Sequence, residues 1–148
     1  METSFRAAEP SDADALVEMM RGLYEHDRSP FDEPSARAAL AQLLADDSLG
    51  AARLILLGGE TAGYFVVTFG FSLEFGGRFV LLDELYLAPA IRGRGWGQRS
   101  LAFAESWTRA QGVAALRLEL NHANTRARAL YVKSGFTSDR RDLFTRRI

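Results

Sequence analysis

A turn rich in glycine and arginine joins a predicted strand to a predicted helix, and it restricts the possible folds more than any other feature. Residues 79–87 have the apolar pattern of a strand, and residues 96–111 have a helical pattern that stops at Gly112. Gly93 and Gly95 lie between them, and Gly97 falls in the first turn of the helix. Glycines let backbone N–H groups approach a ligand closely, and the start of a helix attracts anions. The segment therefore predicts an anion-binding loop.

Two arginines in this turn indicate that the anion is phosphate. Arg92 and Arg94 can form charge-assisted hydrogen bonds to phosphate oxygens. The turn is not a Walker A loop, because no Gly-Lys-Ser/Thr follows it, and its glycine spacing differs from the dinucleotide-binding fingerprint. The alternative is a tight turn whose arginines are simply solvated.

The remainder of the chain alternates between strand and helix patterns, without repeats or linkers. Ser11 is the expected N-cap of the first helix, which carries a periodic apolar face. Gly58 and Gly59 mark the turn of a hairpin. We expect strands at residues 5–8, 53–57, 62–71, 79–87 and 116–120, further helices at 35–45, 96–111 and 125–134, and one or two strands in 136–148. This order predicts a mixed α/β layer fold rather than a doubly wound parallel sheet.

Length and composition restrict the class of protein. A chain of 148 residues, 47% of them hydrophobic, suits one domain, which we expect to span residues 1–148. The absence of cysteine excludes disulfides and a cysteine nucleophile, and His26 and His122 are too far apart to suggest a metal site. No apolar run approaches the roughly 18 residues of a membrane span, and no signal peptide is evident. We therefore expect a soluble, cytoplasmic protein with no membrane partner and no metal.

The near-zero net charge of −1 hides a strong asymmetry. Residues 1–84 carry 15 acidic and 6 basic side chains, whereas residues 85–148 carry 4 acidic and 12 basic ones. An anionic ligand is therefore expected near the second half, unless both halves are only solvated surface. The arginines of residues 140–147 lack interleaved aromatic residues apart from Phe144, so we do not expect a nucleic-acid partner.

Two motifs of the chain resemble those of the GCN5-related N-acetyltransferases, the GNAT superfamily. The run Arg92-Gly93-Arg94-Gly95-Trp96-Gly97 is similar to that family's pyrophosphate loop. Asn124, followed by Tyr131 and then Gly135-Phe136, is similar to its second signature. The resemblance implies a mixed sheet of six to seven strands flanked by about four helices. It also implies an opening between the fourth and fifth strands that the acyl-CoA arm fills.

The resemblance also implies acetyl-CoA as co-substrate and assigns residues to it. Backbone groups of the fourth strand would pair with the pantetheine arm, and N–H groups of the loop would hold the pyrophosphate. Asn124 would hydrogen-bond the cofactor, although its other possible role is to cap the helix that follows. The expected cofactor-binding residues are Leu85, Tyr86, Leu87, Arg92, Gly93, Arg94, Gly95, Trp96, Gly97, Gln98, Asn124 and Tyr131.

Tyr131 and a pair of carboxylates are the candidate catalytic residues. Tyr131 resembles the family's general acid, and a phenol with a pKa near 10 is protonated at neutral pH. The alternative role for Tyr131 is that of a buried aromatic residue. Asp83 and Glu84 lie where family members keep a carboxylate that accepts the proton of the amine. Strand alternation predicts that the two point to opposite faces of the sheet, and we prefer Glu84 as the base.

The acceptor is expected to be a primary amine of a small molecule. The region between the first two helices includes Asp27, Asp32 and Glu33, and its acidity favours a cationic acceptor such as a polyamine or an aminoglycoside. The alternatives are a peptide or protein amine, and a non-catalytic domain that binds acyl-CoA. A homodimer is expected because subunits of this family often exchange elements.

Overall fold

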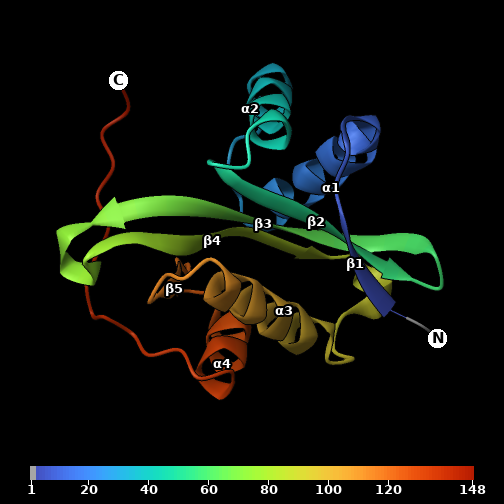
Figure 1. Ribbon diagram of the computed structural model, residues 1–148. Coiled ribbons are helices and arrows are strands. Elements are labelled where there is room, and N and C mark those ends of the chain that lie inside the picture. The colour runs from blue at the N-terminus through green and yellow to red at the C-terminus, as the bar shows by residue number, and fades with distance from the viewer. Residues whose placement is uncertain (1–2) are drawn as a thin grey trace.

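The protein is built on a single five-stranded sheet. A computed structural model describes residues 3–148 (Figure 1). The strands are β1 (Thr3–Ala7), β2 (Gly50–Leu57), β3 (Glu60–Ser72), β4 (Gly77–Leu87) and β5 (Leu116–Leu118), and they lie in the order β1-β2-β3-β4-β5. The first four are antiparallel to their neighbours, whereas β5 runs parallel to β4. The predicted mixed α/β layer fold is therefore confirmed.

Four helices cover the two faces of the sheet. Figure 1 shows α1 (Ala13–His26) and α2 (Glu33–Ala45) on one face, and α3 (Trp96–Ala110) and α4 (Thr125–Lys133) on the other. Each face has its own apolar core: Leu54 and Tyr64 pack under α1 and α2, whereas Ile55 and Phe65 pack against α3. Consecutive residues of a strand thus serve opposite cores, as the period of two requires.

The starts of the first two helices differ from the predicted positions because of capping interactions. A 3-10 turn at Pro10–Asp12 precedes α1, so Ser11 does not cap that helix; Glu9 and Asp12 instead form reciprocal capping contacts. The second helix begins at Glu33, two residues before the predicted start, because the Asp32 side chain accepts a hydrogen bond from the Ser35 N–H. Gly112 follows α3 with φ +74°, as expected of a terminating glycine.

The expectation of six to seven strands was wrong, because residues 136–148 do not form strands in the part of the chain that the structure describes. This C-terminal segment runs along the outside of the molecule (Figure 1). Side-chain ion pairs hold it, namely Arg117 with Asp139 at 3.0 Å and Arg141 with Glu74 at 2.5 Å. Four consecutive charged residues, Asp139 to Asp142, interrupt the alternation of apolar and polar residues that a strand needs.

The parallel ladder between β4 and β5 is short. It pairs Val80 with Leu116 and ends at Leu82 and Leu118, whereas β4 continues to Leu87. The last four residues of β4, Glu84 to Leu87, therefore have a ladder partner only on the β3 side. The ladder ends where the sequence predicts an opening between the fourth and fifth strands.

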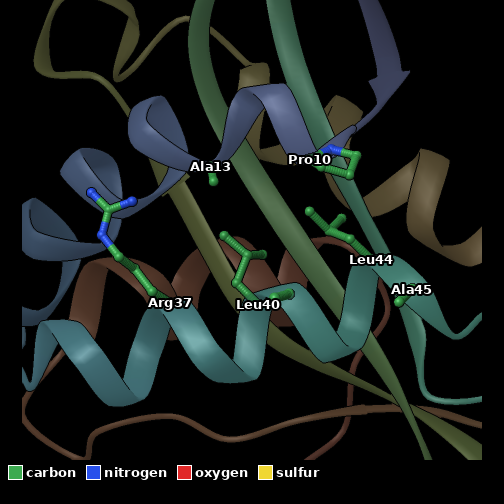
Figure 2. Close-up of a pocket in the computed structure, with 7 residues that line it drawn as sticks. Pro10, Ala13, Arg37, Leu40, Leu44 and Ala45 are labelled. Carbon is green, nitrogen blue, oxygen red and sulfur yellow. The ribbon is translucent and has the colours of Figure 1, made fainter.

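A small apolar cavity of about 150 Å³ lies between α2 and the start of α1 (Figure 2). Pro10 and Ala13 line it from one side, and Leu40 and Leu44 line it from α2. Arg37 is the one charged residue of its lining among the described residues, and its guanidinium is paired with carboxylates of α1 and α2. The cavity therefore offers no group for catalysis and lies apart from the anion loop.

Candidate active site

The predicted anion loop connects the end of β4 to the start of α3. Arg92 anchors this loop, because its Nε donates a hydrogen bond of 2.8 Å to the Leu87 carbonyl and its guanidinium lies 5.6 Å from the centre of the Tyr86 ring. Gly93 and Gly95 adopt φ values of +74° and +88°, which only glycine reaches without strain. The loop geometry thus requires glycine at both positions.

The first turn of α3 presents free backbone donors at this loop. Gly95 is the N-cap, and the first helical hydrogen bond is donated by the Arg99 N–H to the Gly95 carbonyl at 3.1 Å. The N–H groups of Trp96, Gly97 and Gln98 come before that bond and have no acceptor within the helix. The Trp96 side chain is buried against Ala62, which anchors the turn. A side-chain atom at Gly95 would meet nothing within 4 Å, so the N-cap position itself is open.

Gly97 has a different role, which is close packing between layers. A Cβ at this position would lie 2.8 Å from Leu130 Cδ2 on α4 and 3.8 Å from Leu87 Cδ1 on β4. The missing side chain therefore lets the start of α3 touch both neighbours, and it keeps α4 beside the loop.

Arg126 is a cation at this loop that the sequence analysis did not single out. It lies in the first turn of α4, and its Nη2 would be 3.2 Å from a Cβ built on Gly93. A cation in the first turn of a helix is opposed by the helix dipole. An arginine at this unfavourable position could have indicated a bound anion nearby, because the anion would stabilise the positive charge.

Asn124 takes the capping role that was one of its two predicted roles. Its Oδ1 accepts a hydrogen bond of 3.0 Å from the Ala127 N–H at the start of α4. Seven residues after that cap, α4 presents Tyr131, which is half-buried and lies edge-on to Phe136 at 6.0 Å. Burial raises the pKa of Tyr131, so the phenol is a proton donor at neutral pH.

Asp83 and Glu84 lie beside one cavity, which corrects the prediction that they point to opposite faces. Val66 of β3 pairs with Glu84, and Val67 pairs with Leu82, so Asp83 forms a β-bulge. A bulge inserts one residue and breaks the alternation. Both carboxylates line a cavity of about 320 Å³ together with Leu23, Tyr24, Asp27, Ser29, Pro30 and Arg147.

Two tyrosines hold the Glu84 carboxylate. Tyr24 donates a hydrogen bond of 2.5 Å to Oε2, and Tyr64 donates one of 2.7 Å to Oε1. Burial raises the pKa of Glu84, and the two phenol donors oppose that rise. Burial also raises the pKa of Asp83. Neither tyrosine was predicted, since their partner lies 60 and 20 residues away along the chain.

Residues 3–148 contain no cluster of three or more His, Cys, Asp or Glu side chains arranged to hold a metal ion. None of the helices in the described part of the chain is both long and apolar enough to cross a membrane.

The sequence matches the acetyltransferase (GNAT) family model over residues 16–136. An uncharacterized N-acetyltransferase of Bacillus subtilis is 30% identical over 139 residues, which cover 92% of this chain and 91% of the relative. An aminoglycoside N(6')-acetyltransferase type 1 of Stenotrophomonas maltophilia is 27% identical over 146 residues, which cover 97% of this chain and 92% of the relative.

Solved structures have the same fold. An integron cassette protein from the mobile metagenome of Cole Harbour Salt Marsh matches with a TM-score of 0.85 at 30% identity, covering 97% of this chain and 90% of that one. The aminoglycoside N-acetyltransferase AAC(6')-Iy, solved in complex with CoA, matches with a TM-score of 0.85 over 99% of this chain and 95% of its own, but at 16% identity it shows the fold alone. The family match and the glycine loop that opens α3 agree, and the chain belongs to the GNAT acetyltransferase family.

Proposed function

We propose that the protein transfers an acetyl group from acetyl-CoA to a primary amine of a small cationic molecule. The observation that carries this proposal is the position of two sites on one strand. The anion loop follows the end of β4 at Leu87, and the acidic cavity lies where Asp83 bulges from the same strand. A thioester bound along β4 would place its acyl group beside the carboxylates.

The residues of the anion loop and of its neighbours on β4 and α4 fit the cofactor. The N–H groups of Arg94, Gly95, Trp96 and Gly97 would hold the pyrophosphate, with Gln98, Gly93 and Arg92 beside it. Leu85 and Leu87, on either side of Tyr86, lie where β4 has no ladder partner on the β5 side, so their backbone can pair with the pantetheine arm. Arg126 adds positive charge at the loop, and the capping residue Asn124 lies two positions before it.

The side chains present can move the required protons. Bound acetyl-CoA would supply the thioester carbonyl that the amine attacks. Asp83 or Glu84 accepts a proton from the acceptor ammonium, since an ammonium has no lone pair for attack. The Leu85 N–H can stabilise the negative charge that develops on the carbonyl oxygen. Tyr131 gives its proton to the departing CoA thiolate as the carbon–sulfur bond breaks, and solvent then reprotonates the phenolate.

The cavity and the relatives support a cationic acceptor. Three carboxylates line the cavity against one guanidinium, which gives it a negative potential. The relative from Stenotrophomonas maltophilia is an aminoglycoside acetyltransferase. Aminoglycosides and polyamines are therefore the acceptor classes that we propose.

Exposed apolar side chains support a homodimer. Phe71 and Leu73 lie exposed at the end of the β3–β4 hairpin, and Leu143 and Phe144 lie exposed in the C-terminal segment. Pairing of these surfaces between two copies would remove them from water. Light scattering across a concentration series measures the oligomeric state directly.

Thiol release from acetyl-CoA tests the proposed function. The purified protein is incubated with polyamines, aminoglycosides, single amino acids and peptides with free N-termini. Release with polyamines or aminoglycosides supports the proposal, whereas release with peptides alone would reassign the acceptor. Acetyl-CoA binding without release, unaffected by Tyr131→Phe, would instead indicate a non-catalytic binding domain.

A charged side chain at the loop tests the placement of the pyrophosphate. Gly95→Glu should abolish acetyl-CoA binding, because it puts a carboxylate among the donors at the start of α3. Gly59→Glu is the matched control, since Gly59 has φ +83°, equally open surroundings and a remote position between β2 and β3. Both variants should lose similar stability, about 1–2 kcal/mol for the left-handed backbone. Calorimetry that finds unchanged binding to Gly95→Glu would refute the placement.

A further inference from the structure

We infer that Tyr24 and Tyr64 are positioning residues that fix Glu84 as the carboxylate that binds the cationic acceptor, leaving Asp83 to take the proton. The inference rests on the proposed function and divides the work of the two carboxylates. It reverses the preference for Glu84 as the base that the sequence analysis stated.

The two phenols clamp Glu84 from different parts of the fold. Tyr24 comes from α1 and binds Oε2, whereas Tyr64 comes from β3 and binds Oε1. Tyr64 is fully buried in the sheet, and the Tyr24 ring packs edge-on against Phe31 at 5.2 Å. The carboxylate therefore cannot turn without breaking a hydrogen bond to a rigid partner.

This clamp makes Glu84 a poor proton acceptor but a good electrostatic partner. Each carboxylate oxygen already accepts an O–H bond, and hydrogen bonds to the charged form favour that form. Each oxygen keeps a second lone pair for an N–H donor, whereas protonation would give up the negative charge that both phenol donors stabilise. Glu84 thus keeps its negative charge at a fixed position, as a binding group for an ammonium requires.

Asp83 has the complementary properties. It sits in the bulge, where it lacks a partner in the β3 ladder, and its side chain is exposed at the cavity. Within residues 3–148, no side-chain hydrogen bond restrains its oxygens, in contrast to Glu84. Its oxygens are therefore free to meet the N–H of an acceptor, directly or through water, and partial desolvation in the cavity raises the pKa of Asp83 above its ordinary value.

The other groups around Glu84 give the cavity a negative balance. Tyr24 faces it from α1 and Asp27 from the C-cap of that helix, and Tyr64 faces it from β3. Asp83 of β4 and Arg147 of the C-terminal segment complete the surroundings. An acceptor with two or more ammonium groups fits this arrangement, with one group on Glu84 and the reacting amine at Asp83. A polyamine or aminoglycoside has that chemistry.

The pH dependence of kcat and kcat/KM with such an acceptor separates the roles. Tyr24→Phe and Tyr64→Phe each remove one donor, so the Glu84 pKa rises and the acidic limb of kcat/KM should move up by about one to two pH units. Activity should recover above that limb, because the chemistry is intact. Glu84→Gln should raise the acceptor KM at pH values above the acidic limb, where Glu84 is charged in the wild type, and keep most of kcat. Asp83→Asn should lower kcat about 100-fold with little change in KM.

Glu60→Gln is the control for the loss of a carboxylate, since Glu60 begins β3 and does not line the cavity. Carbon-13 NMR of the Glu84 carboxyl gives a second readout that needs no turnover. Its titration should move to higher pH in Tyr24→Phe and Tyr64→Phe, and an unchanged titration would overturn the clamp.

Two results distinguish this inference from the proposed function. Wild-type protein that neither binds acetyl-CoA nor releases thiol contradicts the proposed function itself. Active protein in which Glu84→Gln abolishes kcat while Asp83→Asn retains it would reverse only the assignment made here. The expected split between KM and kcat in the two variants supports it.

Discussion

The contact between Gly97 and Leu130 predicts a stability defect that a second substitution repairs. An alanine Cβ at position 97 would lie 2.8 Å from Leu130 Cδ2, whereas ordinary carbon contacts begin near 3.4 Å. About half an ångström must come from Leu130 or from a shift of α4. Forcing an extra methyl group into a packed site costs about 1–3 kcal/mol, and the gain in helix propensity returns less than 1 kcal/mol.

We therefore expect Gly97→Ala to lower the free energy of unfolding by about 1–2 kcal/mol and the Tm by roughly 3–6 °C. Leu130→Ala removes the clashing carbon. In that background, Gly97→Ala should cost nothing or stabilise slightly, so the two substitutions couple by about 1–3 kcal/mol. Urea unfolding of the four proteins of this double-mutant cycle measures the coupling.

Gln98→Ala serves as the control, because this exposed neighbour should change stability by less than about 0.5 kcal/mol. A Gly97→Ala protein as stable as the wild type would refute the close-packing role. So would an equal loss with and without Leu130→Ala, since the loss would then arise elsewhere.

Three further predictions concern the active site. Tyr131→Phe should lower kcat about 100-fold while calorimetry finds the acetyl-CoA Kd within about twofold, and unaltered turnover would exclude the acid role. Among residues 3–148, Arg147 is the one cation that lines the acidic cavity, so Arg147→Ala should lower the KM for a cationic acceptor about two- to fivefold, with Arg146→Ala as control. Burial raises the pKa of Glu84 in the folded protein above the ordinary glutamate value of 4.5. The contribution of Glu84 to the free energy of unfolding is therefore most favourable below pH 4.5, and it is lost as the pH rises through the pKa of the folded state. Glu84→Gln should therefore gain stability relative to wild type between pH 4 and pH 8 in urea unfolding, and a gap that narrows with pH would contradict this.

The local parts of the fold were predictable from the sequence. The hairpin turn at Gly59, the stop at Gly112 and the loop around Gly95 depend on backbone conformations that glycine allows, so sequence and structure agree there. The order of strand and helix patterns along the chain predicted the mixed α/β layer fold. Periodicity alone assigned the helices to within a few residues.

The predictions from sequence that were wrong or incomplete concern contacts between residues far apart in the chain. Strands were expected in residues 136–148 from their apolar residues, but strand formation needs a neighbouring edge, and the charges at Asp139 and Arg141 pair with distant side chains instead. The two tyrosines on Glu84 come from α1 and β3, and no local pattern joins them to β4. The role of Asp83 depended on a bulge that has no sequence signature.

That bulge also determines how β4 tolerates changes in length. Before it, Val80 and Leu82 face α3; after it, Leu85 and Leu87 face that same side, and Glu84 faces α1. Deleting Asp83 would close the bulge and restore strict alternation, with Glu84 still facing α1 and Leu85 still facing α3, so the cavity would lose one carboxylate and the apolar layer would be kept. A one-residue insertion or deletion that leaves the bulge in place would instead exchange the two faces of the strand beyond it, whereas point substitutions change one side chain. Variation in acceptor preference among related chains should therefore arise by substitution in β4, and changes in length should be confined to loops such as the one between α1 and α2.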